Sequence, residues 1–291
     1  MKTRNVMPLD FGHGFTLIEL LIGLLISLFI IAGAVTFLIT SSRTLVNQSS
    51  EDLIQENARF AFEILSSNGR LLGLNQSADP NVLTEGVFDD AICNLGGGGA
   101  NIDCNANALI YDLNGQDIDY DSVAFDYVIS GGTTCAGNAI TQETKVVTVF
   151  FVADLDENGT GDGISSLYCR SFEAQLNPLT SNFDTFTEPN GALAIIDGID
   201  SLQIQYGVDT NNDGSIERYS SYPRVTNADK ANVKAIKVGL LVSSGQTIAS
   251  DQNVVVNQAR TYQIFDSPNI VITDTVLRQI YSTTIFLPNN S

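Results

Sequence analysis

The chain has 291 residues and a formal net charge of −19, with 33 acidic residues against 14 basic ones. The electrostatic field of so much negative charge repels phosphate backbones, which argues against direct binding of nucleic acid over a broad surface. The only histidine is His13, so the rest of the chain lacks the residue on which Ser-His-Asp catalysis, Cys-His catalysis and most histidine metal sites depend. No motif points to nucleotide binding or catalysis, and we do not expect an enzyme.

The first 40 residues consist of a short polar leader and a long apolar run. After Gly14, residues 15–39 are almost uninterruptedly apolar and carry a single charge, Glu19. Roughly 20 apolar residues in a helix match the thickness of a bilayer core, so this run can cross a membrane. Lys2 and Arg4 precede it, and this favours an N-terminus that stays in the cytoplasm.

Glu19 is the exception within the apolar run. Placing a carboxylate there costs roughly 2.5–3.5 kcal/mol on insertion scales, and such a charge usually has a function. The closest cations in sequence, Arg4 and Arg43, both lie outside the run. If the chain were cut between Gly14 and Phe15, the new α-amine of one subunit could neutralise Glu19 of its neighbour.

The segment Gly14-Phe15-Thr16-Leu17-Ile18-Glu19 before an apolar helix resembles the class III signal of type IV prepilins and type II secretion pseudopilins. In that family a prepilin peptidase cuts after the glycine and methylates the new N-terminus, which here would be Phe15. The apolar helix remains as membrane anchor and later becomes the filament core. An ordinary secretory signal is cleaved after its apolar region instead, and a simple single-pass anchor would not explain Glu19.

Residues 41–72 are expected to continue the helix into water as an amphipathic segment. Apolar residues recur there at helical spacing with charged residues between them, namely Val46, Leu53, Ala58 or Ile54, Ala61, Leu65 and Leu72. We expect this stripe to pack on a sheet, and Asn68-Gly69 and Gly73 to stop the helix. Residues 15–72 would then form one helix of roughly 85 Å.

The remainder of the chain changes to the period of strands. Apolar residues alternate at 123–129, 202–208 and 236–242, residues 145–152 indicate a buried strand, and residues 278–287 indicate a last strand. Strands that follow one long helix and are separated by Gly, Asn, Asp and Ser clusters indicate an α+β fold with a mainly antiparallel sheet. Residues 73–121 and 246–275 are rich in loops, and no strand order is predicted for them.

These patterns divide the chain into four parts. They are a leader of residues 1–14, a membrane-spanning half-helix of residues 15–40, an amphipathic half-helix of residues 41–72, and a β-rich domain of residues 73–291.

Four cysteines lie beyond the apolar run, and none belongs to a C-x-x-C pair, so zinc is a poor interpretation. An even number of cysteines in an exported domain indicates two disulfides, for which three connectivities exist. We favour Cys93–Cys104 together with Cys135–Cys169. The first pair would close a glycine-rich loop, residues 96–99, that nothing else in the sequence orders.

Two acidic loops share one layout, with oxygen-bearing side chains at positions 1, 3 and 5, glycine at 6 and an acid at 9. The first contains Asp154, Asp156, Asn158 and Asp162, and the second contains Asp209, Asn211, Asp213, Ser215 and Glu217. The spacing is that of the first part of an EF-hand loop, which converges hard ligands on one calcium ion. Both loops lack the glutamate of position 12, and Asp, Asn and Gly also favour turns without metal. We expect no required cofactor, and calcium is the candidate ligand of these loops, the second in particular.

Several segments beyond the N-terminus resemble the PilW-type minor pilins of type IV pilus systems. They are Glu56-Asn57-Ala58-Arg59-Phe60-Ala61, Leu167-Tyr168-Cys169, residues 198–210 (GIDSLQIQYGVDT), and the final strands at 233–244 and 278–288. The resemblance implies a type IV pilin-like fold, a single-pass anchor in the bacterial inner membrane and a C-terminal domain in the periplasm. It also implies a place at the pilus tip with other minor pilins, in a complex that primes assembly of the major pilin and often carries a PilY-type adhesin.

Two alternatives stand beside this interpretation. A J-type minor pseudopilin of a type II secretion system belongs to the same broad class, and the LYC and YGVDT segments argue against it. A membrane-anchored enzyme or binding protein belongs to another class, and the missing histidine argues against that. Adhesion, twitching motility and DNA uptake are all functions of such pili, and the sequence does not select among them.

Overall fold

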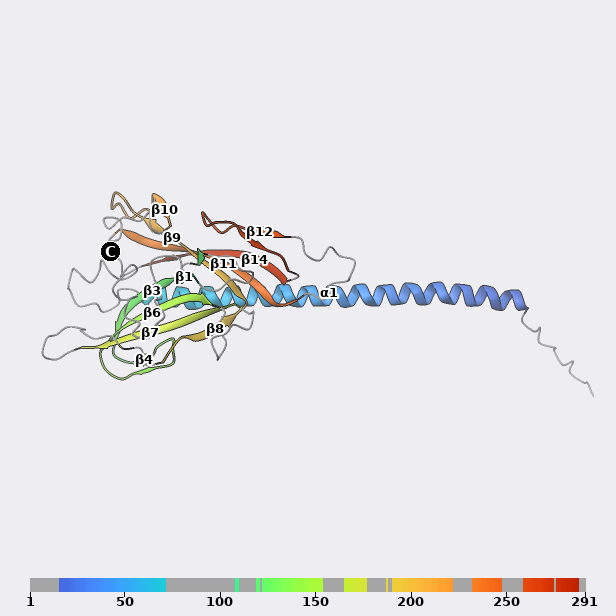
Figure 1. Ribbon diagram of the computed structural model, residues 1–291, viewed down its shortest axis with the longest axis horizontal. Coiled ribbons are helices and arrows are strands. Elements are labelled where there is room, and N and C mark those ends of the chain that lie inside the picture. The colour runs from blue at the N-terminus through green and yellow to red at the C-terminus, as the bar shows by residue number, and fades with distance from the viewer. Residues whose placement is uncertain are drawn as a thin grey trace, which may run out of the picture. The chain divides into compact units, whose positions relative to one another are not determined.

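A computed structural model describes residues 16–71, 108–109, 119–120, 122–153, 165–176, 187, 190–221, 232–247, 259–274 and 276–287. The chain forms two compact units, one that ends at Ser49 and one that begins at Ser50. A single helix, α1 (Leu17–Leu71), runs without a break from the first unit into the second (Figure 1).

In the first unit, α1 exposes apolar side chains on every side. The exposed fraction is 78% for Leu17 and 71% for both Phe29 and Phe37. A helix that is apolar all round is not stable in water and needs lipid or protein around it. By length and composition this part of α1 can cross a bilayer, which fits a membrane anchor.

The few hydroxyl groups in this apolar stretch are paired within the helix. Ser27 donates to the carbonyl of Gly23 at 2.7 Å, and Thr36 donates to the carbonyl of Ala32 at 2.9 Å. Such bonds to the preceding turn leave no unpaired hydroxyl donor to face an apolar surrounding.

In the second unit, one stripe of α1 is buried, formed by Ile54, Ala58, Ala61, Leu65 and Gly69. These residues recur at intervals of three and four, so they share one face of the helix. The stripe confirms the amphipathic segment but begins later than predicted. Both Val46 and Leu53, which were assigned to it, are more than 40% exposed.

α1 continues through Asn68-Gly69 to Leu71, in agreement with the predicted helix to residue 72, and Gly73 lies outside the described residues. A Cβ atom on Gly69 would lie 3.0 Å from Cγ2 of Ile285 and 3.5 Å from Cε1 of Phe125. The glycine therefore serves the close approach of the helix to two strands rather than a turn.

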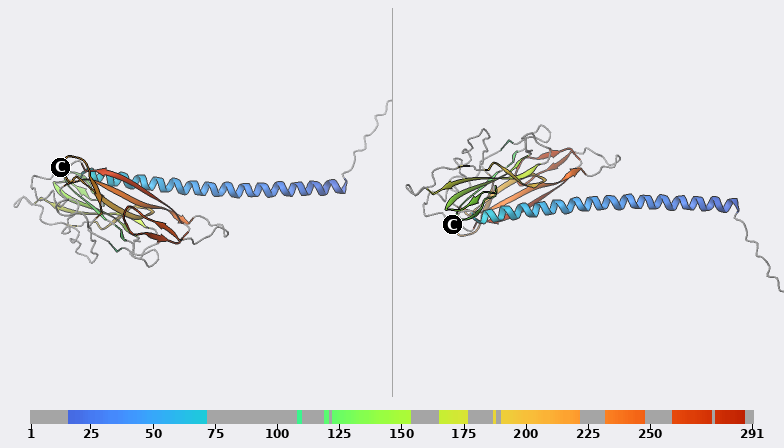
Figure 2. Two further views of the ribbon diagram at one scale, coloured as in Figure 1. Left: turned by 90° about the horizontal axis from the view of Figure 1, so that it is seen from above. Right: turned by 90° about the horizontal axis from the view of Figure 1, so that it is seen from below.

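Two four-stranded antiparallel sheets contain all the described strands that are longer than three residues (Figures 1 and 2). The first sheet has the strand order β3 (Val123–Ile129), β6 (Thr144–Ala153), β7 (Ser166–Gln175), β8 (Leu193–Asp197). The second sheet has the order β10 (Arg218–Ser220), β9 (Ile199–Val208), β11 (Val233–Thr247), β14 (Val276–Phe286). One long helix with antiparallel sheets confirms the α+β class.

Three two-stranded ribbons complete the described strands. They are β1 (Ala108–Leu109) with β2 (Asp119–Tyr120), β4 (Gly132–Thr133) with β5 (Ala139–Ile140), and β12 (Arg260–Tyr262) with β13 (Ile270–Ile272). All of them lie in segments where the sequence pattern gave no strand prediction.

The main core lies between the buried stripe of α1 and one face of each sheet. Its side chains include Leu65 from the helix, Phe125 and Phe150 from the first sheet, and Leu202 and Leu240 from the second. Every residue of β6 is buried, because its other face belongs to a second apolar cluster with Val147, Val149 and Phe151. This confirms the prediction of a buried strand at 145–152.

The β12–β13 ribbon covers the face of the second sheet that is turned away from α1, here called the outer face. Leu241 of β11 is buried there against Ile264, Ile270 and Ile272. A Cβ atom on Gly239 would lie 2.8 Å from Cε2 of Phe265, so only glycine allows the ribbon to come this close.

Candidate functional site

Glu19 lies in the first turn of α1, where its carboxylate caps the helix. Oε2 accepts hydrogen bonds from the backbone N–H of Thr16 at 2.9 Å and from the Thr16 hydroxyl at 3.0 Å. The N–H of Glu19 in turn donates to Oγ1 of Thr16 at 3.3 Å. This reciprocal pairing is a capping box, and it places the acid where the helix dipole favours negative charge.

The cap occupies only one of the two carboxylate oxygens of Glu19. Both Thr16 donors contact Oε2, and within the described part of the chain Oε1 has no hydrogen-bond partner. The side chain can therefore hold its own helix end and still accept an external cation. Gly14 and Phe15, between which cleavage is predicted, lie outside the described residues.

The cap was missed in the sequence, although its signal is present. Thr16 and Glu19 follow the pattern of a hydroxyl residue, two intervening residues and a glutamate before an apolar run. That pattern is itself a helix start signal.

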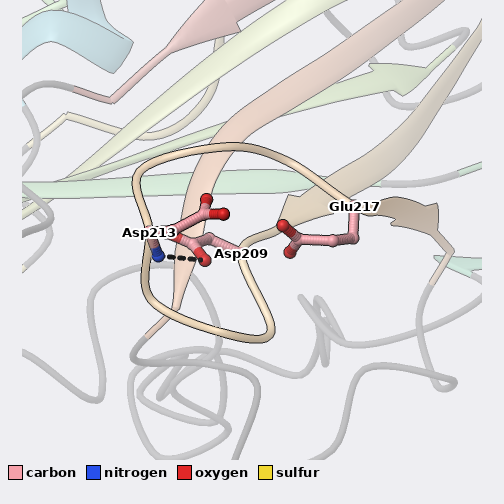
Figure 3. A group of neighbouring side chains, drawn as sticks. All are labelled: Asp209, Asp213 and Glu217. Carbon is pink, nitrogen blue, oxygen red and sulfur yellow. Dashed lines mark hydrogen bonds between the residues drawn. The ribbon is translucent and has the colours of Figure 1, made fainter.

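The second acidic loop connects β9 with β10 and brings three carboxylates together. Oxygen atoms of Asp209, Asp213 and Glu217 lie within 4.8 Å of one another (Figure 3). Asp209 follows directly after β9 and is fully buried, whereas Asp213 and Glu217 are exposed. Gly214, the sixth position of the loop, has a φ of 90°, which requires glycine or a strained residue.

Backbone N–H groups already occupy these carboxylates. Asp209 accepts from Asp213 at 3.2 Å and from Gly214 at 2.8 Å, and Asp213 accepts from Ser215 at 2.8 Å. The bond from Ser215 holds the pKa of Asp213 below its usual value of 3.8. Such Asx turns order the loop without an ion, while three neighbouring negative charges would still favour a cation.

Asn211 and Ser215, the two further members of the predicted ligand set, both contact this cluster. The amide of Asn211 donates to Asp213 at 3.0 Å. Glu217 is held in place by the backbone N–H of Thr210, which donates to it at 2.7 Å. Ser215 contacts the cluster through its backbone N–H, which donates to Asp213. The first acidic loop, with Asp154, Asp156, Asn158 and Asp162, lies outside the described residues.

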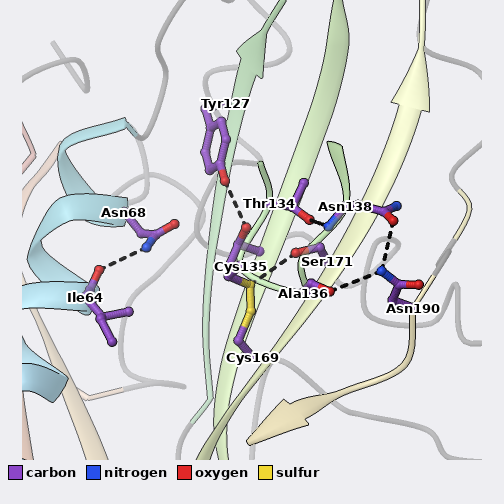
Figure 4. The surroundings of a disulfide bond; sticks show 11 residues. Ile64, Asn68, Tyr127, Thr134, Cys135, Ala136, Asn138, Cys169, Ser171 and Asn190 are labelled. Carbon is purple, nitrogen blue, oxygen red and sulfur yellow. Dashed lines mark hydrogen bonds between the residues drawn. A yellow bond between two sulfur atoms is a disulfide. The ribbon is translucent and has the colours of Figure 1, made fainter. Parts of the chain in front are cut away.

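The structure joins Cys135 and Cys169 in a disulfide, with their Cα atoms 6.2 Å apart (Figure 4). Cys169 belongs to β7 and to the main core, and Cys135 lies between β4 and β5. The bond therefore ties the β4–β5 ribbon to the first sheet. The other predicted pair, Cys93 and Cys104, lies outside the described residues.

Hydrogen bonds support the same ribbon. Asn190 donates to the carbonyl of Ala136 at 3.1 Å and to Oδ1 of Asn138 at 2.9 Å (Figure 4). Asn138 in turn donates to Glu173 of β7 at 3.0 Å. The ribbon is thus held by one covalent bond and several polar contacts.

Segments that are far apart in sequence meet where the helix passes the two sheets. The side chain of Asn57 donates to the carbonyl of Asp197 at 2.9 Å. The next residue, Gly198, has a φ of 78° and accepts a backbone hydrogen bond from Ser243 at 2.7 Å. The helix segment 56–61 and the segment that begins at Gly198 therefore form one structural junction.

A buried ion pair joins three strands of the second sheet. Arg278 of β14 pairs with Asp200 of β9, and each side chain is only 5% exposed. Ser243 of β11 donates to Asp200 at 3.1 Å, and Arg278 also pairs with Asp274 at 2.6 Å. Burial alone would lower the pKa of Arg278, but Asp274 and Asp200 raise it and keep the guanidinium charged.

Comparison with known proteins gives one family match, over the C-terminal part of the chain. Residues 149–289 match the family model PilW, described as type IV pilus-assembly protein W. No curated protein matches the chain. Among solved structures, a type IV-like pilin from Thermus thermophilus has 10% sequence identity and a TM-score of 0.40, over 81% of this chain and 96% of that one. The range of the family model includes Cys169, the second acidic loop and the Asp200–Arg278 pair.

Proposed function

Since the chain is a PilW-type pilin, we propose that it acts as a minor pilin in a tip complex that primes assembly of a type IV pilus. The observation that supports this most is the match of residues 149–289 to the pilus-assembly family, in a chain whose N-terminal helix is apolar and exposed. The partners in this proposal are the other minor pilins, the major pilin and a PilY-type adhesin at the tip.

In the proposed life cycle the prepilin peptidase cuts between Gly14 and Phe15 and methylates the new N-terminus. Residues 15–40 then hold the subunit in the inner membrane, with the β-domain in the periplasm, until the assembly motor extracts it. Glu19 sets the register of the filament when it meets the Phe15 amine of a neighbour. The unoccupied Oε1 of the capping box is compatible with that pairing.

Deletion of the gene tests this function. We expect surface pili to be lost or strongly reduced, and to be restored by the wild-type gene in trans. Secretion of enzymes by any type II system should be unchanged. Any redundant subunit of the same type should be deleted as well, since it would mask the effect. Normal pili together with lost enzyme secretion would identify a J-type pseudopilin instead.

Calcium binding at Asp209, Asp213 and Glu217 stays a prediction. The clustered carboxylates are compatible with an ion, and the turn hydrogen bonds explain the same geometry without one.

A further inference from the structure

The second sheet ends in a long strand whose far side pairs with no strand among the described residues. β14 pairs with β11 along its length, from Phe286 opposite Ala235 to Arg278 opposite Ser243. The strand order of the sheet ends at β14, and no described strand pairs with its other side. At 11 residues it is much longer than the other edge strands β3, β8 and β10, which have 7, 5 and 3.

The ladder shows which backbone groups point outward. Leu287 donates its N–H to the carbonyl of Lys234 at 2.9 Å, so residues 279, 281, 283 and 285 turn their backbone groups toward β11. By the same alternation, the N–H and C=O groups of Ile280, Ser282, Thr284 and Phe286 point away from the sheet. These four residues also have exposed side chains.

This edge lacks the features that usually prevent strand pairing. Natural edges are short, charged, interrupted by proline or twisted by a bulge. Residues 279–286, with the sequence QIYSTTIF, contain no charge and no proline, and their register with β11 is continuous. Arg278 is the nearest charge, and it is buried in its pair with Asp200. Ile280 and Phe286 are 38% and 66% exposed on the outer face.

We propose that β14 accepts an extended segment of another pilus subunit as a fifth strand of the second sheet. The choice of a pilus subunit as partner rests on the proposed function. Outward N–H and C=O groups at alternate residues match the hydrogen-bonding pattern of an added extended strand. Apolar side chains at alternate positions of that segment would cover Ile280 and Phe286. The guest is a different protein rather than a second copy, because two chains with net charge −19 repel each other and this edge carries no charge to offset that.

Two substitutions block the edge without touching the β11 ladder. Ser282→Pro removes an outward N–H and places a ring where the guest backbone would lie. Thr284→Lys places a charge at the edge. Ser282→Ala and Thr284→Ser are the matched controls, and the melting temperatures of all four full-length proteins should agree within a few degrees, since no described intramolecular hydrogen bond is lost.

The test is recovery of identified pilins with the tagged full-length protein, expressed from its own locus and purified from detergent-solubilised membranes. A photoreactive benzoylphenylalanine at position 284 maps the contact. We expect about tenfold less recovered pilin with either blocking variant than with its control, and cross-links to alternate residues of one extended segment in a pilin of different sequence.

Equal recovery from blocking and control variants would overturn the pairing, as would cross-links only to a second copy of this chain. These outcomes are separable from failure of the proposed function. If deletion of the gene abolishes pili but the blocking variants behave like their controls, only the strand pairing fails. If deletion leaves pili intact, the proposed function fails.

Discussion

Among single residues, Glu19 combines a structural contact with the role proposed for assembly. The capping box uses Oε2 and stabilises the helix end by about 1 kcal/mol or less, which is smaller than the cost of placing the charge in a membrane. Capping alone therefore does not account for the acid at this position. An ion pair that forms only in the assembled filament would offset the rest of the cost of placing this charge in a membrane.

Replacing Glu19 by alanine should separate insertion from assembly. We expect Glu19→Ala to insert normally, because the variant no longer carries roughly 2.5–3.5 kcal/mol of charge cost. Incorporation into pili should fall, since the neighbour's amine loses its partner. Membrane fractionation measures the first effect and counts of surface pili the second, with Leu20→Ala as the adjacent control. Normal pilus numbers with Glu19→Ala as the sole copy would contradict this role.

The acidic loop makes a separate prediction about calcium. Three carboxylates with no glutamate at position 12 should bind weakly, with a Kd of roughly 10⁻⁴–10⁻³ M, as in extracellular modules. Calorimetric titration of the full chain in detergent measures it. Asp213→Asn should abolish binding, whereas Glu143→Gln, an exposed acid elsewhere, should leave it unchanged. No heat and no change in melting temperature at millimolar calcium would leave only the turn interpretation.

Residue patterns predicted some of these contacts and not others. The spacing of Asp209, Asp213 and Glu217 was enough to predict that their side chains converge, because all three belong to one short loop. The packing of Gly69 against Ile285 was not predictable, since it depends on a strand more than 200 residues away. A glycine in a helix pattern indicates a stop when only local propensity is considered.

Among the contacts between strands, the Asp200–Arg278 pair of β9 and β14 is expected to contribute most to stability. Asp200→Asn leaves a buried guanidinium with Asp274 alone, and we expect the free energy of unfolding to fall by about 3 kcal/mol. Asp274→Asn is the matched comparison, and it should cost less, because Asp274 is 34% exposed and Arg278 keeps its buried partner Asp200. Chemical denaturation of the full chain in detergent measures both.

A double replacement shows whether the pair itself accounts for that loss. Asp200→Leu with Arg278→Met removes both charges and should restore most of the stability, since no buried charge remains unpaired. If the double variant is as unstable as Asp200→Asn, the loss comes from packing of β9 against β14 rather than from the ion pair.

Most of the long strands were predictable and the short ribbons were not. Alternation indicated β9 and β11, and a continuous run of β-branched and aromatic residues indicated the buried strand β6. β7 has 10 residues but was not predicted as a strand. The ribbon β12–β13 has strands of 3 residues and is held by packing on Leu241 and by the glycine at 239. Tertiary contacts rather than local propensity create such elements.

For the whole molecule, the first expectation concerns the mature N-terminus. Cleavage between Gly14 and Phe15 with one added methyl group should give a protein that begins at N-methylphenylalanine. Intact-mass analysis of the protein extracted from membranes measures this. A bulky residue at Gly14 should leave the leader attached. A mature N-terminus beyond Ile39 would mean that residues 15–39 are an ordinary signal peptide, and the mature protein would then lack this membrane anchor.

The position of the protein on assembled pili distinguishes a subunit of the tip from a subunit of the filament shaft. Immunogold labelling of an epitope-tagged, functional copy on sheared pili shows where the subunit lies in the filament. A minor pilin of a tip complex should be labelled at one end of a filament and nowhere along its length. Label distributed along the filament, or pili that form normally without any label in a strain that produces the tagged protein, would contradict a tip and priming role.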